Sequence, residues 1–279
     1  MQIPPSDFHF YLPSNAASSK VRGIQMASAL GGTFALRQVF PAEVVVFVKE
    51  PPSPRVLEHA RHRCAYVAYD PVDDYRFGRM AGLGVDAVIA CNSVHAERLA
   101  SATGCDRIVA IPHHHCMIQG EIMVCDRGPR VGYVGDGANL GLDPSSLGPE
   151  FLCGGDLSIL GKIGIGIAYR PEGEARLYKS GVKLANYWAN SVAAVCSPDA
   201  SFLEMGTDGE DMLVARSADD VVRLSKRLAE DGDLRMRLVT AGAARAADYG
   251  IGRIGMKYLE MLEILKGKNA RFPNAKKAN

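Results

Sequence analysis

Short apolar runs alternate along the chain with longer stretches in which apolar residues recur every three or four positions. In the first half the apolar runs cover residues 8–12, 44–48, 65–69, 87–91 and 107–111, and helical patterns lie near residues 55–63 and 94–103. The runs are apolar at successive positions, as strands covered on both faces require. Strands that alternate with helices predict βαβ units, and therefore an α/β fold built on parallel sheets.

The pattern pauses between residues 112 and 129 and then resumes. Further strands are expected at residues 130–134, 163–168, 192–196 and 212–214, with helices at 182–190, from Ser217, from Asp233 and near 254–265. Ser217 followed by Asp220 has the spacing of a capping box. We therefore expect two Rossmann-like lobes that face each other across a cleft, at residues 1–118 and 128–252. A helix at 253–265 and a basic tail at 266–279 follow them.

Composition and charge narrow the function classes. Of the 279 residues, 47% are apolar and 23% are charged, the balance of a globular protein and not of a disordered one. The 32 basic and 31 acidic side chains leave a net charge of +1, so no nucleic-acid partner is expected. The sequence shows neither a long apolar run nor a basic region followed by an apolar stretch at the N-terminus. We expect a cytoplasmic protein without a transmembrane segment or secretory signal.

Seven scattered cysteines and three adjacent histidines raise the question of a metal site. The sequence contains no CxxC pair, which favours reduced thiols. Adjacent side chains on an extended segment point to opposite faces, so His113, His114 and His115 are not expected to converge on one ion. No metal is therefore expected. The alternative is that these histidines line a hinge, where His113 or His114 hydrogen-bonds a hydroxyl or a phosphate group of a ligand.

Ligands of open parallel sheets bind beyond the carboxyl ends of the strands, so the residues that follow each strand are the candidates for a site. In the second half these are Gly135, Arg170, and Lys183 with Asn186 on the helix at 182–190. A lysine in the first turn of a helix and an arginine that follows a neighbouring strand suit a phosphate group. The competing interpretation is that both are ordinary solvated cations and Asn186 an ordinary helix amide.

The first half offers a second group of candidates after its first strand. Ser18, Ser19, Lys20 and Arg22 form a turn of small and basic residues that would let a phosphate approach the backbone. The alternative is a plain helix N-terminus. Asp70 follows the strand at 65–69 and is a candidate base, or else part of a loop at the edge of the cleft.

The segment at residues 181–195, GVKLANYWANSVAAV, resembles the nucleotide-sugar half of GT-B glycosyltransferases. One bacterial branch of that family reads KLxNAWAAGxPAV here. The similarity extends over residues 150–265, and residues 8–118 match in outline, best at 86–104 and 111–112. Two glutamates eight positions apart are usual in the family, but this chain has Tyr178 and Asn186, and Ser191 and Ala193 replace the usual Gly and Pro.

The resemblance implies a compact glycosyltransferase that moves a sugar from a nucleotide-sugar donor to a glycan, lipid-linked or protein acceptor. It implies a retaining, metal-independent reaction with no cofactor beyond the nucleotide-sugar co-substrate, and it is compatible with peripheral contact at the inner face of the membrane. The implied residues are, for the donor, Gly135, Arg170, Lys183, Leu184 and Asn186; for the acceptor or phosphate side, Ser18, Ser19, Lys20 and Arg22; and for catalysis, His113, His114 and Asp70. The C-terminal helix is expected to pack across toward the first lobe.

Other functions remain as alternatives. The missing acidic pair is compatible with a non-catalytic relative that binds a nucleotide sugar or a glycan. A two-lobed periplasmic-type binding protein would need a secretory signal. A dinucleotide oxidoreductase is disfavoured, because no GxGxxG follows the first predicted strand.

Overall fold

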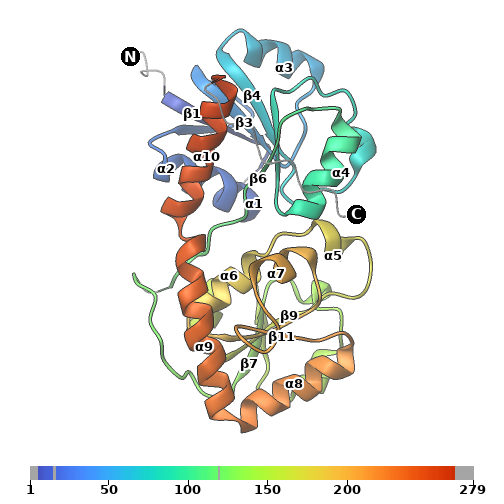
Figure 1. Cartoon of the computed structure of the whole chain (residues 1–279), viewed down its shortest axis with the longest axis vertical. Coiled ribbons are helices and arrows are strands. Elements are labelled where there is room, and N and C mark those ends of the chain that lie inside the picture. The colour runs from blue at the N-terminus through green and yellow to red at the C-terminus, as the bar shows by residue number, and fades with distance from the viewer. Residues whose placement is uncertain (1–5, 15–16, 119, 268–279) are drawn as a thin grey trace.

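The computed structural model describes residues 6–14, 17–118 and 120–267, and most of the predicted basic tail lies outside them. The described chain forms two α/β lobes, one above the other in Figure 1. The first lobe is built on a six-stranded sheet in the order β2-β1-β3-β4-β5-β6, and the second on a five-stranded sheet in the order β11-β10-β9-β7-β8. All pairings within the two sheets are parallel, which confirms the predicted fold class.

The first lobe encloses its sheet between two apolar layers. Its strands and helices are β1 (Ser6–Leu12), α1 (Ala17–Ser19), α2 (Met26–Ala29), β2 (Thr33–Leu36), β3 (Ala42–Val48), α3 (Pro54–Arg61), β4 (Cys64–Asp70), β5 (Ala87–Ala90), α4 (Ser93–Thr103) and β6 (Ile108–Ala110). Alternate residues of β3 enter opposite layers: Val44 and Val46 pack with Phe10, whereas Val45 and Phe47 pack with Leu99 of α4. Successive apolar residues in a strand are thus explained by burial on both faces.

The second lobe repeats this plan with shorter strands. Its elements are β7 (Val131–Val134), β8 (Leu152–Gly154), β9 (Ile165–Ala168), α5 (Ala175–Tyr178), α6 (Val182–Ala189), β10 (Ala193–Cys196), α7 (Ala200–Met205), β11 (Leu213–Val214), α8 (Ala218–Glu230) and α9 (Gly232–Ala246). Ser217 accepts a hydrogen bond from the Asp220 amide and begins α8, as the capping pattern predicts. Trp188 of α6 lies at the centre, fully buried, and donates from Nε1 to the Asp211 carbonyl oxygen at 2.8 Å.

The chain returns to the first lobe at its C-terminal end. Helix α10 (Ile251–Leu265) continues from α9 through a 3₁₀ turn and runs upward beside α2 in Figure 1. Ile254, Tyr258, Met261 and Leu262 of α10 belong to the same core cluster as Phe8 and Phe10 of the first sheet. The stripe of apolar residues predicted for this helix therefore covers the first lobe, although the preceding helix belongs to the second.

Packing between α6 and α9 depends on a glycine. A Cβ added to Gly242 would lie 2.2 Å from Trp188 Cδ1, whereas one added to Gly252 of α10 would meet no atom within 4 Å. We expect Gly242→Ala to lower the free energy of unfolding by about 1–3 kcal/mol, because overpacking outweighs the gain of about 1 kcal/mol in helix propensity. The matched variant Gly252→Ala is expected to leave stability unchanged or to raise it. Urea unfolding of both variants would measure this difference, and equal stabilities would contradict the packing argument.

Candidate functional site

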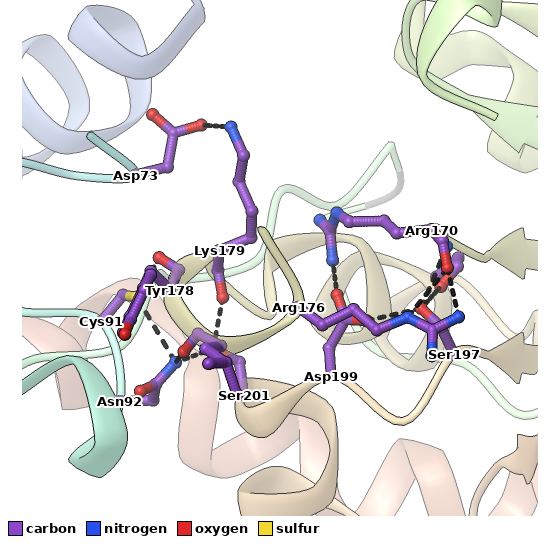
Figure 2. Close-up of polar contacts among 12 residues, drawn as sticks. Asp73, Cys91, Asn92, Arg170, Arg176, Tyr178, Lys179, Ser197, Asp199 and Ser201 are labelled. Atoms are coloured by element: carbon purple, nitrogen blue, oxygen red, sulfur yellow. Dashed lines mark hydrogen bonds and ion pairs between the residues drawn. The ribbon is translucent and has the colours of Figure 1, made fainter. Parts of the chain in front are cut away.

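Residues that follow strands of the first sheet contact residues of the second lobe and so bridge the lobes (Figure 2). Asn92, after β5, donates from Nδ2 to the Leu177 carbonyl oxygen at 3.0 Å and to Ser201 Oγ at 2.8 Å. Lys179 of the second lobe points across to Asp73 of the first, with 2.5 Å between Nζ and Oδ2. Ligands of parallel α/β sheets bind beyond the carboxyl ends of the strands, and in this region hydrogen bonds connect the two lobes.

Lys183 lies at the carboxyl end of β7, in the first turn of α6. Its ammonium group donates to the Val134 carbonyl oxygen at 2.6 Å and lies 4.5 Å from the centre of the Tyr133 ring. Gly135 follows with φ of 147°, and a Cβ on it would come within 2.6 Å of Lys183 Nζ. The glycine therefore leaves the space that the ammonium group occupies. The structure brings together the predicted pair Gly135 and Lys183.

The charge of Lys183 has no carboxylate partner among the residues that the structure describes. Among the ion pairs of the described residues, none includes this lysine. Burial, followed by the nearby positive charge of Arg170, lowers the pKa of Lys183 to about 8. A partly buried cation without a carboxylate partner is stabilised by an anionic ligand, which would raise this pKa again.

Arg170 is close to Lys183 but is already paired. Its guanidinium group forms an ion pair with the fully buried Asp199 and lies 5.4 Å from the centre of the Phe202 ring. The backbone amide of Arg170 donates to Ser197 Oγ at 3.0 Å, and Ser197 donates to Asp199 Oδ1 at 2.5 Å. The predicted contact of Arg170 with a diphosphate therefore stays a prediction, for a guanidinium group that already has a carboxylate partner. Asp199 already neutralises much of its charge, which leaves Lys183 as the main cation for an anion.

Two of the predicted donor residues serve the interior instead. Leu184 is fully buried in the core of the second lobe, so its side chain does not reach a ligand. Asn186 is also buried, and its Oδ1 accepts a hydrogen bond from the Cys116 amide at 2.7 Å. This side chain holds the segment that joins β6 to β7, the interlobe segment, and its predicted contact with a ribose or sugar hydroxyl stays a prediction. Helical periodicity predicts that Asn186 shares a helix face with Lys183, but the interlobe segment packs against Asn186.

On the first lobe, Arg22 and Asp70 form a buried ion pair, with 2.7 Å between Nε and Oδ2 and side chains that are 0% and 2% exposed. Arg22 Nη1 donates to the Pro112 carbonyl oxygen, and Asp70 Oδ1 accepts from the Val72 amide. Tyr258 of α10 lies against the same arginine, 5.6 Å from its ring centre. In this geometry both side chains are buried and engaged with protein partners, so the predicted roles of Arg22 toward a phosphate and of Asp70 as a base have no structural support and stay predictions.

The rest of the predicted phosphate turn is divided between the surface and the interior. Lys20 is exposed, and Ser19 is buried. The hydroxyl oxygens of Ser18 and Ser19 are buried and have no hydrogen-bond partner within the described part of the chain. Residues Lys20–Gln25 form a π-helical stretch, an uncommon conformation that recurs at functional sites. The turn that follows β1 thus contains two buried hydroxyl groups near the carboxyl end of that strand.

His113 and His114 are buried at the start of the interlobe segment, and His114 also lines a hollow of about 590 Å³ together with Gln25. His114 shares a 2.8 Å hydrogen bond between Nε2 and Gln25 Oε1. Burial, followed by the charge of Arg22, lowers the pKa of His113 well below its ordinary value and that of His114 to about 4. Both rings are therefore neutral near pH 7. Their burial does not support the predicted contact with a sugar hydroxyl or phosphate.

The buried histidine makes stability depend on pH. The folded-state pKa of His114 is about 4, below the ordinary 6.5, so unfolded chains bind more protons between these values. Stability is then highest above the ordinary pKa and falls as the pH drops toward about 4. The free energy of unfolding of the wild type falls between about pH 7 and about pH 5. We expect this fall to be about 2 kcal/mol smaller in His114→Gln. Urea unfolding at both pH values would measure this, and parallel losses would contradict it.

No group of three or more possible metal ligands occurs within residues 6–14, 17–118 and 120–267. Over the same residues, no helix is both long and apolar enough to cross a bilayer. The absence of a resident metal remains a prediction that metal analysis of the purified protein would test.

Tyr178 is the main feature of the site that the sequence did not reveal. This residue of α5 belongs to the second lobe, but its ring is buried in the core of the first. It packs edge-on against Phe77 at 5.0 Å between ring centres and lies 5.7 Å from the ring of His95. The Tyr178 carbonyl oxygen also accepts a hydrogen bond from Cys91. Tyr178, at one of the two positions where the resembled family carries a glutamate, thus connects the two lobes by packing and a hydrogen bond.

Comparison with solved structures places this architecture among glycosyltransferases. Sucrose-phosphate synthase from Thermosynechococcus elongatus aligns with a TM-score of 0.68 and 12% identity, over 94% of this chain and 100% of that chain. HepE from Anabaena, in complex with UDP and glucose, gives a TM-score of 0.66 and 9% identity, over 92% and 99% of the two chains. A glycosyltransferase from Rickettsia africae aligns with a TM-score of 0.64 and 10% identity, over 96% of this chain and 100% of that chain.

No family model matches the sequence, and no curated protein matches it either. The structural likeness covers both lobes and nearly the whole length of each neighbour, so the chain has the two-lobed GT-B fold of glycosyltransferases. This confirms the fold that the resemblance around residues 181–195 implies.

Proposed function

We propose that this protein is a glycosyltransferase that transfers a sugar from a nucleotide-sugar donor to a glycan or glycoconjugate acceptor. One observation carries the proposal: the ammonium group of Lys183 has no carboxylate partner within the described chain and lies at the carboxyl end of the second sheet. A solved neighbour of the same fold holds UDP-glucose, so a UDP-sugar is the first donor to test. The retaining, metal-independent course is proposed from the sequence resemblance alone.

Within this proposal, the diphosphate of the donor would lie at the N-terminus of α6. The first-turn amides of Val182, Lys183 and Leu184 have no intrahelical partner, as at every helix N-terminus, and such amides suit an anionic group. As the sugar bond breaks, negative charge grows on the leaving diphosphate, and a fixed cation with backbone N–H groups stabilises that charge. The backbone of Leu184, not its side chain, would then serve the donor.

A second candidate function is a non-catalytic protein that binds a nucleotide sugar. It is favoured by the two positions where the resembled family carries glutamates. Tyr178 packs in the core of the first lobe, and Asn186 holds the interlobe segment. Neither supplies an acidic group to a donor.

A donor screen separates the two functions. Thermal shift with UDP-, GDP-, dTDP- and CMP-sugars would identify the nucleotide, and product analysis with the selected donor would follow. A glycosyltransferase is expected to release free nucleotide by transfer or slow hydrolysis, and to stop doing so when Lys183 is replaced by methionine. Binding without turnover would support the second function, and binding of no nucleotide sugar would contradict both.

A further inference from the structure

A group of basic residues without ion-pair partners in the described part of the chain lies on the first lobe, in a hollow that Lys183 does not line. It lines a cavity of about 610 Å³ between α3 and the segment that joins β2 to β3. Three arginines and one histidine contribute to the cavity wall, and none of the described residues that line it is acidic. The basic residues are Arg37, Arg55, His59 and Arg63.

Two of the three arginines are oriented by backbone carbonyl groups, and none of the three has an ion-pair partner among the described residues. Arg37 donates from Nε to the Pro13 carbonyl oxygen at 3.1 Å, and Arg63 donates from Nη1 to that of Val39 at 3.4 Å. Neither these two nor Arg55 belongs to an ion pair of the described residues. Carbonyl contacts orient a guanidinium group and leave its positive charge available to an anion.

Arg37 also has an unusual backbone conformation. Its φ is 55°, in the left-handed region that residues with a side chain rarely adopt. Its amide donates to the Leu12 carbonyl oxygen at 3.0 Å, which fixes the residue at the carboxyl end of β1. Strained non-glycine residues of this kind cluster at sites that bind ligands.

The floor of the cavity is aromatic and apolar. Tyr11 and Phe40 line it together with Val39 and Val56. Tyr11 packs on Phe47 of β3 with 4.8 Å between ring centres, so its ring is fixed against the sheet. Glu50 interacts electrostatically with Tyr11, but it is not among the lining residues. The cavity thus combines a rim of positive charge with an apolar floor.

We propose that this cavity binds a phosphate monoester whose organic part rests on Tyr11 and Phe40. A phosphate monoester carries about −1.5 to −2 charges and three acceptor oxygens, which suits three guanidinium groups better than a single carboxylate does. The ligand is either a free phosphorylated compound or the phosphate headgroup of a lipid. The site is separate from Lys183, so it does not depend on the proposed function.

Phenyl phosphate is a suitable probe, because it joins a phosphate to a ring that fits the aromatic floor. Calorimetric titration into the full chain is expected to show saturable binding at one site. We expect phenyl phosphate binding to weaken about tenfold or more in Arg55→Gln and in Arg63→Gln. Binding should be unchanged in Arg227→Gln, which makes the same charge change at an exposed position of α8. Absence of saturable binding, or an equal loss in all three variants, would overturn the proposal.

Two further arms identify the source of the phosphate and keep the two sites apart. Flotation with phosphatidylcholine vesicles, with and without phosphatidic acid, tests the lipid source. Flotation that needs phosphatidic acid and is lost in Arg55→Gln would identify a lipid headgroup, and phenyl phosphate binding without flotation would identify a soluble ligand. Nucleotide binding should be unchanged in Arg55→Gln, so a failure at one site is distinguishable from a failure at the other.

Discussion

Replacing Lys183 with methionine is expected to weaken nucleotide-sugar binding by about 10–150-fold. The substitution keeps the length and apolar stem of the side chain but removes the charge that no carboxylate of the described chain neutralises. A charge-assisted contact with phosphate contributes about 1.5–3 kcal/mol, which gives this range. Stability should not fall, because burial already disfavours the charged form of this lysine.

The same site has a predicted dependence on pH. Since the pKa of Lys183 in the free protein is about 8, its ammonium group loses its proton as the pH rises through that value. Binding of an anionic donor is therefore expected to be strongest below about pH 8 and to weaken above it. In Lys183→Met this step should be absent.

Lys162→Met is the matched control, since Lys162 is an exposed lysine of the same lobe. Calorimetry with the nucleotide that the donor screen selects would measure all three proteins. Equal affinities in wild type and Lys183→Met would place the donor elsewhere. A loss in Lys162→Met of the same size would show an effect of net charge alone.

Asp70→Ala is expected to destabilise the fold by about 3–5 kcal/mol, the usual effect of leaving one partner of a buried ion pair without its counter-charge. Arg22 is fully buried, and its Nη2 already has no hydrogen-bond partner among the described residues. By comparison, Glu150→Ala breaks an exposed pair with Arg130 and should change stability by about 1 kcal/mol or less. Urea unfolding of the two variants compares a buried with an exposed pair.

A double variant separates a structural role of Asp70 from a catalytic one. Replacing both partners, as Arg22→Met with Asp70→Leu, removes both buried charges and is expected to regain most of the lost stability. If Asp70 is structural, this folded double variant should still bind and turn over a donor. Complete loss of turnover with native stability and donor binding would support the prediction that Asp70 is the base.

The fold was largely predictable from the sequence, because parallel strands that are buried on both faces have apolar residues at successive positions. Two strands escaped this pattern. β2 lies at the edge of its sheet, where Phe34 and Leu36 are 46% and 48% exposed, and β8 has three residues in a glycine-rich stretch. Neither carries a run of buried side chains that an apolar pattern could show.

The site was predictable only in part. The position of Lys183 beside Gly135 follows from local rules, since one residue follows a strand and the other begins a helix. The partners of Arg170 and Asp70 do not, because Asp199 and Arg22 are brought to them by tertiary packing. Sequence distance alone does not reveal which cations a fold has already neutralised.

The central claim is that the donor binds at the carboxyl end of the second sheet. Hydrogen–deuterium exchange of the full chain, with and without the nucleotide sugar that the screen selects, locates that site directly. The account predicts slower exchange of the backbone amides at residues 133–137 and 181–184, and no such change in Lys183→Met at the same concentration of ligand. Slower exchange confined to other segments, with these two unchanged in a saturated wild-type protein, would contradict it.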